Sequence, residues 1–223
     1  QINDVKFASV SKLETLPDTI RTLEQYSDAI VLRHPEIGAA ATSAKYASIP
    51  IINAGDGIGE HPTQAMLDLF TIQEEVGRLE NLRVTFVGDL KHGRTVHSLI
   101  KLLDRRDGIR YQTVSPKHLS SDRDLVWSDE LTKDILAETD VLYITRIQKE
   151  RLLDPSEAEG WTDKYVLTKE LSEAMPSGSV IMHPLPRVGE IAMEVDDLPN
   201  AAYFRQAQNG MFMRMAILAS LVR

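Results

Sequence analysis

Hydrophobic and polar positions alternate along the chain with two different periods. Short β-branched runs predict strands, and longer stretches in which apolar residues recur every three or four positions predict helices. The predicted strands are residues 29–32, 49–52, 84–87, 110–114, 141–144 and 180–182. The predicted helices are residues 36–46, 62–76, 94–103, 129–137, 169–175 and 206–222. Such alternation is typical of an α/β protein with parallel sheets.

The helix predicted over residues 62–76 has the clearest ends. Pro62 suits a first helical turn, where its missing N–H has no partner to lose, and Gly77 suits the position after the last turn. Strand–helix alternation restarts at Val84, so we place the domain connection just after this helix. We predict one domain from residues 1–75, completed by residues 206–223, and a second domain from residues 76–205. Between Pro116 and Trp127 the pattern is weak, because a polar string stands where a fuller helix is expected.

Composition narrows the function classes. With 223 residues, 43% of them hydrophobic, the chain can bury the core of one large domain or two small ones. A net charge of −8 argues against a nucleic-acid or anionic-membrane surface, and no apolar run is long enough to span a bilayer. The chain has no cysteine, which removes disulfides, thiolate nucleophiles and Cys-ligated metals and agrees with the cytoplasmic location that we expect. The first residues resemble no signal peptide and lack Met, so we expect a fragment or a trimmed sequence.

Candidate chemistry follows the predicted strands. In open parallel sheets, ligands bind beyond the carboxyl ends of the strands. Five predicted strands run into segments rich in Arg, His and Gln, at residues 33–35, 53–64, 88–95, 145–151 and 183–187. Packing alone does not account for five such endings, so we infer a site for small, highly anionic ligands. The Gly-rich stretch 53–59 lacks the Gly-Lys-Ser/Thr of nucleotide-binding loops, and residues 87–89 do not form a dinucleotide fingerprint.

Single residues in these segments have alternative interpretations. His61 stands just before a predicted helix, where the helix dipole favours a neutral imidazole that donates to a carbonyl oxygen. Taken alone, Arg33 is more often a solvated surface charge and His61 a structural histidine, and only their surroundings favour function. Lys91, Arg151 and Arg187 are as consistent with ion pairs that brace the two domains as with substrate contacts. His34, His97 and His118 are interpreted as structural, and His92 stays open.

Four blocks carry a resemblance to a known family. They read Asn-Ala-Gly-Asp-Gly to His-Pro-Thr-Gln at 53–64, Val-Gly-Asp-Leu-Lys-His-Gly-Arg-Thr-Val-His-Ser-Leu at 87–99, Thr-Arg-Ile-Gln-Lys-Glu-Arg at 145–151 and His-Pro-Leu-Pro-Arg at 183–187. From about residue 12 to its end, the chain resembles the aspartate transcarbamoylases. The ornithine-specific relatives carry Cys where this chain has Pro184. The resemblance implies two parallel-sheet Rossmann-like domains, a carbamoyl phosphate domain truncated at its N-terminus and an aspartate domain, with a C-terminal helix that returns to the first.

The resemblance also implies an activity and a set of residues. The activity is transfer of a carbamoyl group from carbamoyl phosphate to the amino group of L-aspartate in pyrimidine biosynthesis, without a metal or another cofactor. Arg33, His61 and Gln64 are the implied catalytic residues, and they contact carbamoyl phosphate. Leu185 and Pro186 are expected to offer backbone carbonyls to the reacting groups, across a cis peptide bond.

The acceptor substrate is expected to meet a second group of residues. By the same resemblance, Arg94 binds the α-carboxylate of aspartate and Arg146 the β-carboxylate, with Gln148 nearby. Lys12 corresponds to a lysine that reaches into the site of a neighbouring subunit. The family expectation is therefore a homotrimer with shared sites, with regulatory chains or fusion to other pyrimidine-pathway domains left open. The family's Ser-Thr-Arg-Thr motif is absent and is expected upstream of Gln1, and the loop that carries Lys12 departs from the family pattern.

Two other functions are alternatives for this sequence. Six histidines raise the possibility of metal-dependent hydrolysis, but no His-Glu-x-x-His or close His/Asp cluster is present, so we predict no metal site. The other alternative is a non-catalytic assembly or regulatory subunit with a degenerate transcarbamoylase fold. Intact Arg, His and Gln positions across four blocks argue against it, because a site without activity has no reason to keep converging charges.

Overall fold

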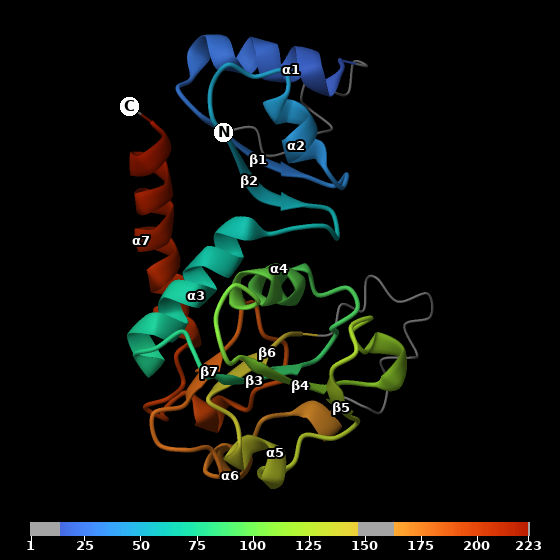
Figure 1. The fold of residues 1–223 in the computed structure, drawn as a ribbon, viewed down its shortest axis with the longest axis vertical. Coiled ribbons are helices and arrows are strands. Elements are labelled where there is room, and N and C mark those ends of the chain that lie inside the picture. Colours follow the sequence, from blue (N-terminus) through green and yellow to red (C-terminus); the bar gives the residue numbers. More distant parts are fainter. Residues whose placement is uncertain (1–13, 147–162, 223) are drawn as a thin grey trace. The chain divides into compact units, whose positions relative to one another are not determined.

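The computed structural model describes residues 14–146 and 163–222, and its helices and strands alternate along the chain (Figure 1). The chain divides into two compact units: unit 1 holds the residues up to Thr63 and those from Arg214 onward, and unit 2 is Gln64–Met213. The boundary predicted between residues 75 and 76 remains a prediction. The elements are α1 (Leu16–Leu23), β1 (Ile30–His34), α2 (Ala39–Ala44), β2 (Ile51–Asp56), α3 (Pro62–Val76), β3 (Arg83–Val87), α4 (Arg94–Leu103), β4 (Arg110–Val114), β5 (Val126–Ser128), α5 (Lys133–Ala137), β6 (Val141–Ile144), α6 (Lys169–Ser172), β7 (Val180–Met182) and α7 (Tyr203–Leu221).

Unit 1 contains a parallel pair of strands with two helices. Ile30 of β1 lies opposite Ile51 of β2. Helix α1 was not predicted, because its apolar face offers few periodic positions over eight residues; Thr15 caps it by accepting the Asp18 N–H at 3.3 Å. Helix α2 is shorter than the predicted residues 36–46. Gly38 has a φ of +80°, which a right-handed helix cannot include, so α2 begins only after it.

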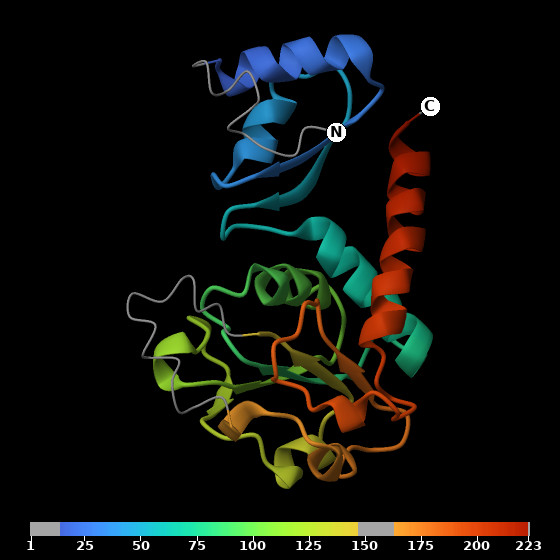
Figure 2. The ribbon, with the colours of Figure 1, turned by 180° about the vertical axis from the view of Figure 1, so that it is seen from behind.

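Unit 2 contains a five-stranded parallel sheet in the order β5-β4-β3-β6-β7. The chain starts in the middle of the sheet at β3, moves outward to β5, and then returns to the other side of β3 with β6 and β7. Within this unit, α4 covers one face of the sheet and α5 and α6 cover the other, as seen from both sides in Figures 1 and 2. Two covered faces and a reversal of strand order define a doubly wound α/β fold.

The burial of β6 on both faces explains why its sequence is a continuous apolar run. Its four side chains are fully buried. Val141 and Tyr143 join a core cluster that includes residues of α3 and α4, whereas Leu142 and Ile144 join a second cluster that includes Leu136 of α5. Side chains alternate between the two faces of a strand, so a strand buried on both faces needs apolar residues throughout. The predicted α/β class with parallel sheets is confirmed, and α7 begins in unit 2 and ends in unit 1.

Several predicted bounds differ from the structure for local reasons. Helix α5 starts at Lys133 instead of residue 129, because Thr132 acts as its N-cap and accepts the Ile135 N–H at 3.3 Å. Strand β5 was not predicted, since it is a three-residue edge strand with 65% of Val126 exposed and shows no apolar pattern. A 3₁₀ turn at Lys117–Leu119 stands where a fuller helix was expected. None of the helices in the described ranges is long and apolar enough to cross a membrane.

Candidate active site

The reversal of strand order in unit 2 marks the edge of the sheet where such folds bind ligands. The strands on its two sides are β3 and β6. The residue after β3 is Gly88, with a φ of +117°, and a Cβ there would lie 2.2 Å from the carbonyl oxygen of Thr145, the residue after β6. Only glycine permits this approach. Arg94 opens α4 just beyond the β3 loop, and Arg146 follows Thr145, so two predicted substrate-binding arginines follow the strands on either side of the switch point.

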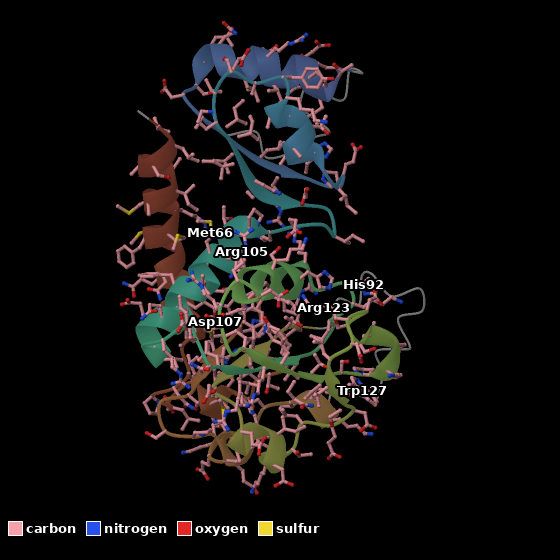
Figure 3. All side chains as sticks on the ribbon, viewed as in Figure 1. Met66, His92, Arg105, Asp107, Arg123 and Trp127 are labelled. Carbon is pink, nitrogen blue, oxygen red and sulfur yellow. The ribbon has the colours of Figure 1, made fainter. Side chains whose placement is uncertain are left out.

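A buried carboxylate shapes the loop between β3 and α4. Asp89 is fully buried, and its Oδ1 accepts the backbone N–H of His92 at 3.1 Å and lies 3.1 Å from the His92 Nδ1. His92, labelled in Figure 3, is therefore tied to the loop itself. The ring of His97 lies with its Nε2 2.8 Å from the carbonyl oxygen of Leu90, in agreement with a structural role. The loop thus leads directly to Arg94, the first residue of α4, at the helix end whose dipole favours negative charge.

The loop after β7 is organised by His183. This residue is 1% exposed, and its Nδ1 accepts the backbone N–H of Leu185 at 2.8 Å. The ring hydrogen therefore sits on Nε2, which donates to Glu190 Oε1 at 2.6 Å. Burial alone raises the pKa of Glu190, but the hydrogen bonds from His183 and from the Val188 N–H outweigh it and hold this pKa below its usual value. The Leu185–Pro186 peptide bond is cis, as predicted.

Gln64 lies in the first turn of α3 and is anchored by Asp68, one turn further along. Its Nε2 donates to Asp68 Oδ1 at 2.8 Å. Asp68 is fully buried and accepts two further hydrogen bonds, from the Tyr143 hydroxyl at 2.7 Å and from Gln206 Nε2 at 2.6 Å. Burial raises the pKa of Asp68 to about 7, although all three hydrogen bonds act to lower it.

Asp68 is a residue that the sequence analysis missed. A usable signal was present, because residues 65, 68 and 72 lie on one face of α3 and the other two are the apolar Ala65 and Ile72. A carboxylate among core positions is expensive unless it is hydrogen-bonded, so its presence there indicates a specific role.

The sequence is consistent with either an ion pair or a substrate contact for Arg187. Its Nη2 donates to Asp196 Oδ2 at 2.6 Å, its Nη1 pairs with Asp196 Oδ1, and its guanidinium lies 5.3 Å from the centre of the Tyr203 ring. The hydrogen bonds from Arg187 hold the pKa of Asp196 below its usual range. Arg187 therefore braces unit 2 internally, by tying the loop after β7 to the start of α7.

The predicted site residues are distributed over both units. Arg33, exposed near the end of β1, and His61, whose Nδ1 lies 3.4 Å from the Thr63 hydroxyl, belong to unit 1. The predicted residues of unit 2 are Gln64, Arg94, Arg146, Leu185 and Pro186. Lys12 and Gln148 lie outside the described residues. In residues 14–146 and 163–222 no group of three or more His, Asp or Glu side chains is placed to hold a metal ion.

The fold and these residues define a two-unit α/β protein with arginine-bearing loops at the carboxyl ends of its strands, an arrangement suited to small anionic substrates. Two family models match the chain: "Aspartate/ornithine carbamoyltransferase, carbamoyl-P binding domain" over residues 1–74, and the "Asp/Orn binding domain" of the same family over residues 80–221. The chain belongs to the aspartate/ornithine carbamoyltransferase family.

Individual relatives agree with this assignment. The aspartate carbamoyltransferase catalytic subunit of Methanocaldococcus jannaschii is 47% identical, over 99% of this chain and 75% of the relative. The multifunctional protein CAD of Squalus acanthias is 48% identical, over 96% of this chain and 10% of the relative. The crystal structure of aspartate transcarbamoylase from Trypanosoma cruzi in complex with carbamoyl phosphate is 42% identical, with a TM-score of 0.92 over 100% of this chain and 75% of that one.

Proposed function

We propose that this chain transfers the carbamoyl group of carbamoyl phosphate to the amino group of L-aspartate, giving N-carbamoyl-L-aspartate and phosphate for pyrimidine biosynthesis. The observation that carries the proposal is the pair of arginines, Arg94 and Arg146, that follow the two strands flanking the switch point of the sheet. Similar structures from Trypanosoma cruzi contain carbamoyl phosphate with aspartate, or N-(phosphonacetyl)-L-aspartic acid, which supports these two substrates.

The proposed reaction needs positioned donors and no covalent intermediate. The aspartate amine attacks the carbamoyl carbon, negative charge develops on the carbonyl oxygen, and phosphate leaves with the electrons of the C–O bond that breaks. His61 and Arg33 are the proposed donors to the carbonyl oxygen, with Arg33 also binding phosphate. Gln64 and the backbone carbonyls of Leu185 and Pro186 accept from the carbamoyl NH₂ and from the incoming amine, which aligns the reacting atoms.

The acceptor is proposed to be aspartate because of its two carboxylates. A guanidinium pairs with a carboxylate through two parallel hydrogen bonds, so Arg94 and Arg146 suit the α- and β-carboxylates respectively. Ornithine carries an ammonium on its side chain, which calls for an acceptor instead of a second arginine. Gln148 is proposed to contact the same substrate, and Lys12 to complete the site of a neighbouring subunit.

The proposed assembly and location follow from the same family. We place the chain in a cytoplasmic homotrimer whose sites are shared between subunits. The multifunctional name of the Squalus acanthias relative supports a setting in which such a chain is fused to other domains of the pathway, and the catalytic-subunit name of the archaeal relative supports a setting with separate chains.

Site variants test the proposed roles. His61→Ala and Arg33→Ala should each lower the kcat of carbamoyl-aspartate formation about 100-fold or more, because removal of one oxyanion donor costs on the order of 3 kcal/mol. The matched controls are the exposed residues His118 and Arg105, the latter labelled in Figure 3. His118→Ala and Arg105→Ala should keep wild-type turnover. Near-normal turnover after His61→Ala or Arg33→Ala, in a folded protein, would contradict the proposed mechanism.

A further inference from the structure

Asp68 connects parts of unit 2 that are far apart in the sequence. It is contacted from its own helix α3 by Gln64, from β6 by Tyr143 and from α7 by Gln206, at 2.8, 2.7 and 2.6 Å. The connection extends one step further, since Gln206 Oε1 accepts the backbone N–H of His183 at 2.9 Å. One fully buried carboxylate thus joins the first turn of α3 to the residue that opens the loop after β7.

The chemistry of a carboxylate sets the orientation of both amides. Both amides meet the Oδ1 oxygen of Asp68, and a carboxyl oxygen without a proton only accepts hydrogen bonds, whereas a glutamine amide donates from its nitrogen and accepts at its oxygen. Gln64 and Gln206 must therefore present their NH₂ groups to Asp68. For Gln206 this leaves the oxygen facing His183, as its contact requires. For Gln64 it leaves the oxygen turned away from Asp68, available to accept from an NH₂ group of a ligand.

We propose that Asp68 is a positioning residue for carbamoyl transfer. It holds the Gln64 carbonyl oxygen ready to accept from the carbamoyl NH₂, and through Gln206 it fixes the start of the loop that carries Leu185 and Pro186. This role rests on the proposed function. The Gln64 side chain and the loop with Leu185 and Pro186 are both proposed to contact the carbamoyl NH₂. Asp68 orients both of them and itself touches no substrate.

Packing alone does not call for a carboxylate at this position. The three partners of Asp68 are neutral, and the shift of its pKa to about 7 reflects the free energy spent on burying its charge. Asp140 in the same unit is different, because it pairs with the guanidinium of Arg83 at 3.0 Å and with that of Arg78 at 3.4 Å. A contact among α3, β6 and α7 made of apolar side chains throughout would bury no charge, so the carboxylate is explained by the orientation that it imposes on the two amides.

A double-mutant cycle tests the proposal in the full-length protein. Asp68→Leu, Gln64→Ala and the double variant are compared with wild type for kcat and for the KM of carbamoyl phosphate, alongside Tm. Asp68→Leu should lower kcat/KM about 30-fold in the wild-type background and only about threefold in the Gln64→Ala background, where the contribution through Gln206 alone remains. Asp68→Asn keeps an acceptor oxygen for both glutamines, so it should stay within about threefold of wild type. Asp140→Asn is the control, and should lower Tm without changing kcat/KM.

A second pair of variants covers the case in which Asp68→Leu does not fold. Gln64→Glu places two carboxyl groups against each other and should lower kcat/KM about 100-fold. Adding Asp68→Asn replaces the second carboxyl group by a neutral amide that still accepts from Gln206, which relieves the repulsion, and it should restore at least tenfold of the loss. A purely structural role for Asp68 predicts no such rescue.

The outcomes separate this proposal from the proposed function. Absence of carbamoyl-aspartate formation by the wild type overturns the proposed function, and the role of Asp68 in that reaction with it. Wild-type turnover, together with a folded Asp68→Leu variant that keeps wild-type kcat/KM, overturns the Asp68 proposal alone. An equal loss in both backgrounds, or no rescue of Gln64→Glu when Asp68→Leu is unfolded, overturns it as well.

Discussion

Replacing Asp68 by Asn should change how the stability of the protein depends on pH. The Asn side chain has nearly the same shape and does not titrate, whereas the pKa of Asp68 is raised from its ordinary value of 3.8 to about 7 in the folded protein, chiefly by burial. The folded protein therefore binds a proton at Asp68 between these two values, and the unfolded chain does not. The stabilisation that this proton provides is fully present below pH 3.8 and is lost as the pH rises through 7.

The magnitude follows from the size of the shift. A difference of about 3 pKa units corresponds to roughly 4 kcal/mol across the whole range, at about 1.4 kcal/mol per unit. Most of it falls within an accessible window: between pH 5 and pH 8, the free energy of unfolding of the wild type should fall by roughly 2–3 kcal/mol relative to Asp68→Asn. The neighbouring Tyr143 does not titrate in this window, because burial raises its pKa well above 10.

Urea denaturation at several pH values measures this difference directly. Subtracting the Asp68→Asn curve from the wild-type curve removes the titration of every other group, provided that the slope m is the same in both proteins. Asp140→Asn serves as a control of opposite sign. Burial alone raises the pKa of Asp140, but its hydrogen bonds with Arg83 outweigh burial and lower it, so its contribution is lost only in acid and should be constant from pH 5 to 8. A difference curve that is flat over this range would contradict a pKa of Asp68 near 7 in the folded protein.

Two further predictions concern the close approach of Gly88 to Thr145 and the absence of a metal requirement. Gly88→Ala should destabilise the protein by on the order of 3 kcal/mol, because its Cβ would meet the carbonyl oxygen of Thr145 at 2.2 Å at a φ of +117°. Gly178→Ala, at a φ of +78° with nothing within 4 Å of its Cβ, should cost only about 1 kcal/mol, and equal losses of Tm would contradict the steric argument. Dialysis against a chelator should leave carbamoyl-aspartate formation unchanged, and activity that is lost and then restored by a divalent metal would contradict a metal-free reaction.

The elements of unit 2 that a sequence pattern predicts best are those buried by their neighbours. The bounds of β4, β6 and β7 and of helices α3 and α4 agree with the prediction. Strands β6 and β7 are buried at every residue and show continuous apolar runs, and a helix with one buried face, such as α4, shows apolar residues at every third or fourth position. Strand β5 lies at the edge of the sheet and has little buried surface, so no period marks it. A helix end that is set by a capping residue, such as Thr132 before α5, is predicted only if the capping residue is considered together with the apolar pattern.

The site residues also fall into two groups, those that the order of strands in the sequence places and those whose contacts depend on packing. The segments that contain Arg94 and Arg146 were singled out because parallel strands deliver the residues after their carboxyl ends to one edge of the sheet, and the roles of the two arginines were implied by the family resemblance. The contacts of Asp68 were not predictable in this manner. Its hydrogen bonds to Tyr143 and Gln206 join residues 75 and 138 positions apart, and they depend on how α3, β6 and α7 pack in three dimensions.

The choice of acceptor amine is tested directly by steady-state turnover with carbamoyl phosphate and either L-aspartate or L-ornithine. Colorimetric detection of the carbamoylated product measures the turnover. We expect N-carbamoyl-L-aspartate and no citrulline, since Arg94 and Arg146 suit two carboxylates and not an ammonium. Citrulline formation would contradict the assignment of the acceptor. A folded full-length protein that carbamoylates neither amine would contradict the proposed function, and a non-catalytic assembly subunit with the same fold would then be the better interpretation.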